Sequence, residues 1–321
     1  MAGGLLGTEN LMRIGTSLVE TGGVAAFDKL TDQLRRAADD GFSSAWMNNI
    51  FGLDALTSLA VVGSRVPGIE VGTAVIPTYP RHPAVLAQQA LTAALAIGGG
   101  RLMLGIGLSH QIVIENMYGY SFDRPARHMR EYLSVLMPLL DGTPVSVDGE
   151  SIRAHIGLST PREAPVPVLV AALGPQMLKL AGEHTYGTIL WMTGPATVRD
   201  HIAPTITAAA AAAGRPAPRV VCILPVSVTG DPDAARGRAA EDFAIYGQLP
   251  SYRAMLDREG AAGPADVAIV GDEDAVTAQL LALADAGVTD FVAAEYDREN
   301  WDRTRSLLRE FMITDRNSGP D

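Results

Sequence analysis

The sequence predicts an α/β fold, a (β/α)8 TIM barrel of parallel strands. Short apolar runs alternate with longer segments of helical periodicity, and this alternation is typical of repeated βα units. Roughly eight such units occur, and that number favours a closed barrel over an open sheet. A length of 321 residues also suits one barrel, so we expect residues 1–321 to form a single domain.

The predicted strands and helices follow one another in register along the chain. The strands cover 13–18, 44–47, 69–76, 102–107, 168–171, 188–192, 219–228 and 288–293. The helices cover 27–40, 53–63, 83–97, 124–140, 175–184, 196–213, 274–286 and 301–311, with another helical stretch before a Gly/Pro-rich loop at 260–264. In the first helix Phe27, Leu30 and Leu34 form an apolar stripe, and Gly41 supplies its C-terminal stop.

An insertion around residues 141–167 interrupts the rhythm. Glycine and proline residues are frequent there, and Asp148-Gly149 lies within an otherwise strand-like run. Asp-Gly is a strong signal for a β-hairpin turn. We therefore expect an excursion from the barrel and not a domain boundary.

Composition argues against several classes of partner. The net charge is −11 with no basic run, which disfavours nucleic acid because phosphate binding needs clustered positive charge. No apolar stretch approaches the ~20 residues of a membrane helix, and residues 1–11 lack a signal-peptide pattern. Cys222 is the only cysteine, and we expect it to be a small buried strand residue. These features favour a cytoplasmic protein that does not contact membranes.

The sequence also lacks the patterns of several catalytic classes. The six histidines are dispersed with no metal-ligand spacing, so no metal site is predicted. Neither a Gly-x-Ser-x-Gly elbow nor a P-loop occurs. We therefore expect an organic cofactor to supply the chemistry.

Two glycine-containing segments stand at predicted strand ends, where barrels carry their functional loops. Gly98-Gly99-Gly100-Arg101 precedes the strand that ends at Gly105-Ile106-Gly107, and these glycines could serve only turning and close packing. Ala171-Ala172-Leu173-Gly174-Pro175 places small residues at the start of a helix, where free N–H groups and the helix dipole can hold a phosphate. Pro175 suits the first helical turn.

Four segments together resemble the luciferase-like monooxygenase superfamily, and in particular its branch that uses the deazaflavin coenzyme F-420. They are Gly41-Phe42-Ser43-Ser44-Ala45-Trp46, the run from Gly72 to Pro83 (GTAVIPTYPRHP), Gly99-Gly100-Arg101 through Gly107, and Ala172-Leu173-Gly174-Pro175 through Ala181-Gly182. Their order and spacing extend the resemblance over most of the chain.

The resemblance implies a set of cofactor contacts. It places Thr73 and Ala74 at a strand bulge behind the tricyclic ring, where relatives often hold a non-proline cis peptide, and it lets Gly107 admit the ring closely. Ala171, Ala172, Leu173, Gly174, Pro175 and Met177 match the segment that receives the cofactor phosphate. Asn48-Asn49 stand where many relatives carry an Asp-His pair, which casts doubt on alcohol oxidation, and Asn48 is expected to hydrogen-bond the ring edge instead.

The resemblance also directs attention to residues that could move a proton. His110 follows the glycine-flanked strand where some relatives carry a glutamate, and its imidazole could protonate or orient a substrate. The alternative is that it only hydrogen-bonds a loop carbonyl. Tyr79 is the second candidate donor. His128 and Arg127 could point toward an anionic cofactor tail, although a salt-bridged face is the commoner outcome, and His82 suits helix capping as well as catalysis.

The resemblance thus implies an oxidoreductase that moves a hydride between coenzyme F-420 and a small organic substrate. Two alternatives stay open: an FMN-dependent luciferase-like monooxygenase, and a non-catalytic flavin- or deazaflavin-binding barrel. The resemblance also implies a homodimer, with 53–62 and 83–97 as candidate faces, although core packing explains the same apolar pattern.

Overall fold

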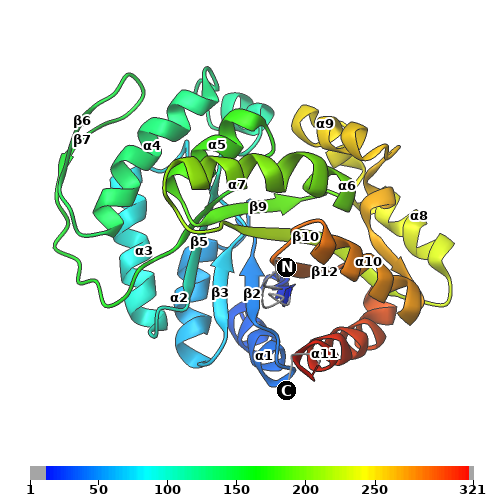
Figure 1. Cartoon of the computed structure of the whole chain (residues 1–321). Helices are drawn as coiled ribbons and strands as arrows, with labels where there is room; N and C mark the ends of the chain where they lie inside the picture. The colour runs from blue at the N-terminus through cyan, green and yellow to red at the C-terminus, as the bar shows by residue number, and fades with distance from the viewer. Residues whose placement is uncertain (1–11, 318–321) are drawn as a thin grey trace, which may run out of the picture.

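Eight parallel strands close into a barrel in the computed structural model, which describes residues 12–317, with side chains to residue 313 (Figure 1). In barrel order they are β1 (Arg13–Ser17), β2 (Ser44–Met47), β3 (Glu70–Thr73), β5 (Leu102–Gly107), β8 (Val168–Val170), β9 (Gly187–Trp191), β10 (Arg219–Val228) and β12 (Asp290–Glu295). Pairing of β12 with β1 closes the ring. The predicted TIM barrel is confirmed. The sequence features of residues 1–11 lie outside the described residues.

Helices surround the barrel (Figure 1). Two of the predicted helix spans, 83–97 and 175–184, are reproduced to the residue. The helices are α1 (Ala26–Asp39), α2 (Ala55–Arg65), α3 (Pro83–Ile97), α4 (Pro125–Leu140), α5 (Pro175–His184), α6 (Pro195–Thr197), α7 (Ala203–Ala212), α8 (Pro232–Asp242), α9 (Pro250–Glu259), α10 (Glu273–Asp285) and α11 (Trp301–Asn317). The predicted helix 196–213 is divided, because a π-helical turn, η2 (Val198–Ile202), lies between α6 and α7. No helix among residues 12–317 is long and apolar enough to cross a bilayer.

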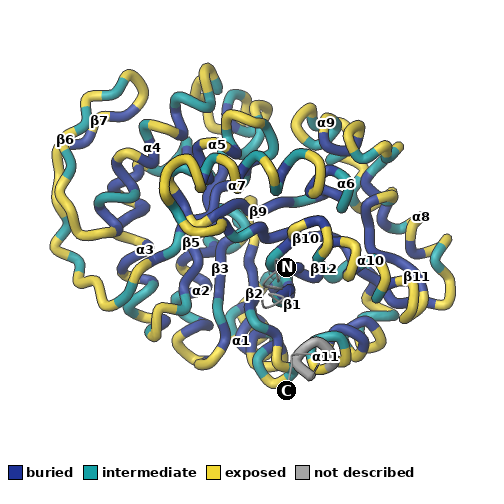
Figure 2. Tube along the Cα trace, in the orientation of Figure 1, coloured by how far each residue is buried: buried dark blue, intermediate teal, exposed yellow. Residues whose placement is uncertain are grey.

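The insertion forms the predicted hairpin at the periphery, beside α4 (Figure 2). Its strands are β6 (Val145–Asp148) and β7 (Arg153–Ile156). The connection is longer than a two-residue turn, since Asp148 pairs with Arg153 and leaves residues 149–152 between the strands. The N–H groups of Glu150, Ser151 and Ile152 in this connection donate hydrogen bonds to the Glu131 carboxylate on α4. The hairpin thus adds to the outside of the barrel and leaves its strand order intact.

Two features depart from the predicted elements. The predicted strand 69–76 is broken, since β3 ends at Thr73 and β4 (Ile76–Pro77) resumes after a cis peptide between Ala74 and Val75. A further strand, β11 (Ile269–Gly271), pairs with the outer end of β10. It escaped prediction because three residues are too few to show a period of two.

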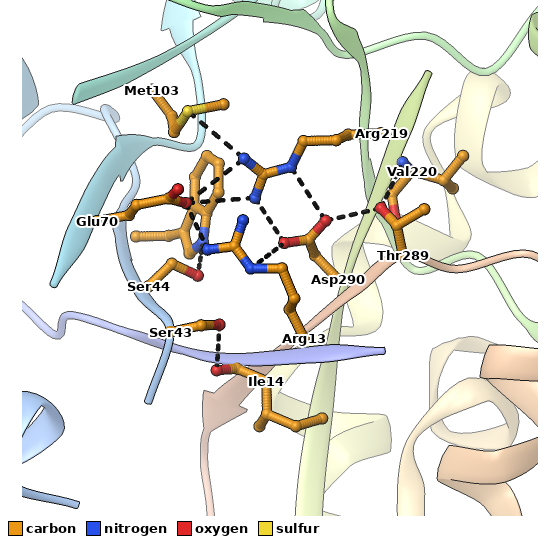
Figure 3. A network of polar contacts seen from close by, with 11 residues as sticks. Arg13, Ile14, Ser43, Ser44, Glu70, Met103, Arg219, Val220, Thr289 and Asp290 are labelled. Carbon is orange, nitrogen blue, oxygen red and sulfur yellow. Dashed lines mark hydrogen bonds and ion pairs between the residues drawn. The ribbon is translucent and has the colours of Figure 1, made fainter. Parts of the chain in front are cut away.

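An ionic network closes the amino-terminal end of the barrel (Figure 3). Arg13 reaches Glu70 at 2.7 Å, and Arg219 reaches Asp290 at 2.5 Å. Arg219 also lies 3.4 Å from Glu70. In parallel barrels this end carries stability, whereas function lies at the carboxyl ends of the strands.

Candidate active site

A ledge of small side chains forms the upper surface of the barrel interior, and we define it as Ala74, Val75, Gly107, Ala171 and Ala294. Alanine and valine members are only partly buried, and they pack on a fully buried inner layer that contains Trp46, Met103 and Leu169. A Cβ atom at Gly107 would lie 2.7 Å from Val75 Cγ2 and 3.1 Å from Ala171 Cβ. Glycine at position 107 therefore lets Val75 and Ala171 pack closely, and the small apolar side chains of the ledge suit an apolar ring.

The break between β3 and β4 shapes this ledge. Thr73 Oγ1 is buried and donates a hydrogen bond of 2.8 Å to the Gly105 carbonyl, so its side chain fixes the strand and does not face the mouth. The N–H of Ala74 donates to the Met47 carbonyl at 2.8 Å. A Cβ on Gly105 would collide with the Thr73 carbonyl oxygen, so part of the glycine pattern serves close packing.

The segment from Ala171 to Pro175 ends β8 and begins α5. Gly174 is the N-cap of α5 with no side-chain cap, and a Cβ atom there would meet nothing within 4 Å. Ala172 is buried, whereas Pro175 is exposed. Unsatisfied N–H groups at a helix N-terminus are an anion-binding arrangement, so the predicted phosphate segment has suitable geometry.

His201 supports this segment and was missed from the sequence. Its Nε2 lies 2.8 Å from the Leu173 carbonyl oxygen. His201 lies in the π-helical turn η2, and such turns are frequent at functional sites. No local sequence pattern signals this contact, because residues 173 and 201 belong to neighbouring βα units.

A second helix N-terminus, that of α6 after β9, already binds a carboxylate of the chain. The Glu259 carboxylate on α9 accepts hydrogen bonds from the N–H groups of Ala196 at 3.0 Å and Thr197 at 2.7 Å. Gly194 leaves room for it, because a Cβ atom there would collide with Glu259. This N–H pair therefore has an anionic partner from the chain itself.

His110 lies just beyond β5 in a constrained turn. Ser109 has a φ of 62°, a conformation that non-glycine residues rarely adopt, and it redirects the chain before His110. The imidazole packs against Tyr252 of α9 with ring centroids 5.6 Å apart, and it makes no hydrogen bond to the described residues. Burial lowers the pKa of His110, so the ring is neutral near pH 7.

Tyr79 packs under the segment that follows His110. Its ring stacks on His128 with centroids 3.9 Å apart and planes within 3°, and on Phe122 at 5.3 Å. Its hydroxyl is buried and has no hydrogen-bond partner among the described residues. Burial, with the nearby charges of Asp123 and Glu115, raises the pKa of Tyr79 to about 12. Tyr79 therefore keeps its proton and can act only as a donor near neutral pH.

His128 has a different environment from the one expected of a residue on a cofactor tail. It is 8% exposed, and its Nε2 lies 3.0 Å from Thr78 Oγ1. Burial lowers the pKa of His128 to about 4. These contacts hold Tyr79 in place, whereas the adjacent Arg127 pairs with Glu150 of the hairpin connection, which is the salt-bridged alternative.

An aromatic cluster lies beside His110, and sequence reasoning largely missed it. We define it as Trp191, Phe243, Tyr246 and Tyr252. Trp191 ends β9, and its ring meets those of Phe243 and Tyr246 edge-on at 5.5 and 5.6 Å. Phe243 and Tyr246 come from the N-cap and the body of η3 (Ala244–Gly247), and Tyr252 comes from α9. Three aromatic residues within ten positions were a signal, although no pattern tied them to β9.

Among the remaining candidates, some side chains hydrogen-bond the start of a helix and one makes no hydrogen bond to the described residues. Asn49 Oδ1 accepts from the Ala55 N–H at the start of α2, whereas Asn48 is exposed and makes no hydrogen bond to the described residues. His82 Nδ1 accepts from the Ala84 N–H and so caps α3. Cys222 is buried, as expected, and burial raises its pKa to about 12. Within residues 12–317 no group of three or more His, Cys, Asp or Glu side chains could hold a metal ion.

Comparisons with known proteins agree with the barrel fold. A 5,10-methylenetetrahydromethanopterin reductase from Methanolobus tindarius is 26% identical over 314 residues, which cover 89% of this chain and 95% of that one. The coenzyme F-420-dependent tetrahydromethanopterin reductase from Methanopyrus kandleri superposes with a TM-score of 0.77 at 23% identity, covering 95% of this chain and 99% of that one. An F-420-dependent secondary alcohol dehydrogenase in complex with an F-420–acetone adduct gives 0.77 at 18% identity, covering 92% and 98%.

The family model for luciferase-like monooxygenases matches residues 6–290. That span includes every ledge residue except Ala294, and it also includes the segment from Ala171 to Pro175, His110 and the aromatic cluster. This chain therefore belongs to the luciferase-like monooxygenase family.

Proposed function

We propose that this protein is an oxidoreductase that binds the deazaflavin coenzyme F-420 at the carboxyl-terminal mouth of the barrel and moves a hydride between it and a small organic substrate. The observation that carries the proposal is the ledge adjoining the uncapped N-terminus of α5. A planar ring and a phosphate of one cofactor need these two features together. The names of the Methanopyrus reductase and of the secondary alcohol dehydrogenase, both F-420-dependent, favour the deazaflavin over FMN.

The residues present fit such a cofactor. The ledge carries only small apolar side chains, and Gly107 has no side chain that would displace Val75 and Ala171. The first N–H groups of α5 and its helix dipole favour a phosphate, and His201 fixes the Leu173 carbonyl just before them. Asn48, exposed after β2, is available to hydrogen-bond the ring edge.

When bound, the deazaflavin supplies or accepts the hydride, while the protein supplies placement and proton transfer. His110 is the candidate acid and base, because a neutral imidazole with no hydrogen-bond partner can both donate and accept a proton. Tyr79 is the candidate donor to a substrate or cofactor oxygen. Its buried hydroxyl lacks a partner, and leaving such a group unpaired costs about 1–3 kcal/mol. A ligand oxygen would remove that cost.

A fluorescence titration tests the cofactor assignment. Adding the purified protein should quench coenzyme F-420 fluorescence to saturation and leave FMN fluorescence unchanged. The reverse result would support the FMN-dependent monooxygenase, and quenching without hydride transfer to any of a panel of activated alkenes and ketones would support the non-catalytic barrel.

The roles of His110 and Tyr79 are tested by His110→Ala and Tyr79→Phe. We expect His110→Ala to lower kcat and to remove a pH dependence of kcat below pH 6.5, because burial lowers the pKa of His110 from that ordinary value. Tyr79→Phe should lower kcat with no change in that profile. Turnover unchanged across pH in His110→Ala would contradict the assignment of His110.

A further inference from the structure

We propose that the substrate of this site is an uncharged molecule with a planar aromatic ring, bound at the mouth of the barrel beside His110 and the aromatic cluster, and that Glu259 excludes anionic substrates. This inference rests on the proposed function, which it deepens by naming the substrate class. Four independent features of the mouth support it.

The first feature is the chemistry of the surfaces that meet at His110. The imidazole faces Tyr252 at 5.6 Å, Tyr252 meets Tyr246 edge-on at 5.2 Å, and Tyr246 meets Trp191. Rings in such a chain present edges and faces to a further ring, and aromatic pairs gain about 0.5–1.5 kcal/mol beyond their buried area. The mouth on this side is therefore suited to a planar ring.

The second feature is that the same surroundings penalise charge of either sign. Burial lowers the pKa of His110, which disfavours its cation. Burial also raises the pKa values of Tyr246 and Tyr252, which disfavours their anions. Only desolvation lowers the pKa of a histidine and raises the pKa of a tyrosine at the same place. A charged ligand group placed among these side chains would meet the same penalty.

The third feature is that nearby charged groups are already paired. Arg253, adjacent to Tyr252, donates to Asp257 and to the carbonyls of Ala261 and Ala262, so it is directed away from His110. Glu259 is held by the N–H groups of Ala196 and Thr197. That N–H pair follows Trp191 by only a few residues and would otherwise attract an anion. Glu259 thus takes the place that a substrate carboxylate or phosphate would occupy.

The fourth feature is an apolar rim around the mouth. The segment after His110 exposes Ile112, Met117, Tyr118 and Tyr120, and η3 exposes Ile245. Large exposed apolar side chains gathered at a site mark binding surfaces for apolar groups. The rim extends the apolar character of the aromatic cluster outward, so a substrate with an apolar body is favoured over a polar one.

An aryl ketone illustrates the chemistry. A hydride from the reduced deazaflavin would form a C–H bond at the carbonyl carbon, the C=O π electrons would pass to oxygen, and that oxygen would take a proton through His110. The ketone is reduced by two electrons and the deazaflavin is oxidised by two, so no further reactant is needed.

The test uses three matched probes on the full chain, measured by isothermal titration calorimetry with and without F-420. They are 2-acetonaphthone, its anionic analogue 6-acetyl-2-naphthoate, and its cationic analogue (6-acetyl-2-naphthyl)trimethylammonium. We expect the neutral ketone to bind at least tenfold more tightly than either charged probe. A charged probe that binds as tightly, or a neutral probe that does not bind at its solubility limit, overturns the proposal.

The role assigned to Glu259 is tested with Glu259→Ala, using Glu241→Ala at an exposed position of α8 as the matched control for loss of one carboxylate. Freeing the α6 N-terminus should tighten binding of 6-acetyl-2-naphthoate by about threefold to tenfold and leave the neutral ketone within twofold, as expected for an anion at a helix N-terminus. Glu241→Ala should change neither. An unchanged anionic-to-neutral ratio in Glu259→Ala refutes exclusion by Glu259.

Two provisions keep these results interpretable. If Glu259→Ala does not fold, as judged by circular dichroism, Glu259→Gln removes the charge with less loss of shape and should shift the ratio in the same direction. Hydride transfer is followed separately by deazaflavin absorbance. If the neutral probe binds more tightly than the charged probes but no hydride transfer is observed, the proposed function alone is refuted. If hydride transfer is observed but a charged probe binds more tightly, the proposed substrate class alone is refuted.

Discussion

Replacing Asp290 with asparagine should strongly destabilise the fold through the ionic network at the amino-terminal end of the barrel (Figure 3). The Asp290 side chain is 1% exposed and accepts from Arg219 at 2.5 and 3.1 Å and from Thr289 Oγ1 at 2.7 Å. Asparagine preserves the shape and removes the charge. Arg219, itself 21% exposed, would then keep only Glu70, at 3.4 Å, as an anionic partner.

The magnitude follows from the cost of a stranded buried charge. Removing one partner of a buried ion pair costs about 3–5 kcal/mol, and the remaining Glu70 contact places this case near the lower limit, at about 3 kcal/mol. Unfolding entropies scale to about 0.7 kcal/mol/K for a chain of this length, so Tm should fall by about 4–5 °C. Differential scanning calorimetry measures this shift, and coincident fluorescence and circular dichroism transitions check that one transition is being compared.

A control and a second substitution separate this explanation from a general effect of mutation. Asp200→Asn breaks an exposed pair with Arg199 and should leave Tm unchanged. Arg219→Met added to Asp290→Asn removes the stranded cation and should recover part of the loss. If Asp290→Asn behaved like Asp200→Asn, the argument from a buried charge would be refuted.

Three further outcomes follow from the site. His128 stays neutral in the folded protein down to about pH 4, whereas in the unfolded chain it takes up a proton near pH 6.5. The free energy of unfolding should therefore fall by about 3 kcal/mol as the pH is lowered from 6.5 to 4. Denaturation of His128→Phe should lack this pH dependence, and an NMR titration midpoint of His128 near 6.5 would contradict the prediction. His201→Ala should weaken F-420 binding about fivefold to tenfold by fluorescence titration while His184→Ala, on the exposed end of α5, does not, and equal effects would remove His201 from the site. Gly107→Ala should weaken F-420 binding more than tenfold because its Cβ atom crowds Val75 and Ala171, whereas Gly237→Ala in α8 has open space and should leave binding unchanged; undiminished affinity in Gly107→Ala would show that the ring does not lie on the ledge.

Much of the fold could be predicted because its signals are local. The apolar stripe of α1, the His-Pro start of α3 and the Gly-Pro start of α5 lie within a few residues of the structure they specify. The same holds for part of the site. Gly107 and the segment from Ala171 to Pro175 lie at strand ends, and alternation of apolar runs identifies strand ends from the sequence.

The features that decide ligand choice depend on residues brought together from distant units. Glu259 reaches the N–H groups of Ala196 and Thr197, His201 reaches the Leu173 carbonyl, and Tyr252 reaches His110. No period of 2 or 3.6 residues records such pairings, because they arise only when α9 folds back over the mouth and the βα units pack side by side. The sequence by itself determined the barrel and the edge of the sheet at which we propose that the cofactor binds. The tertiary structure decided which helix N-terminus stays open and which side chains surround the proposed substrate site, since both depend on contacts that form only once the ring of strands is closed.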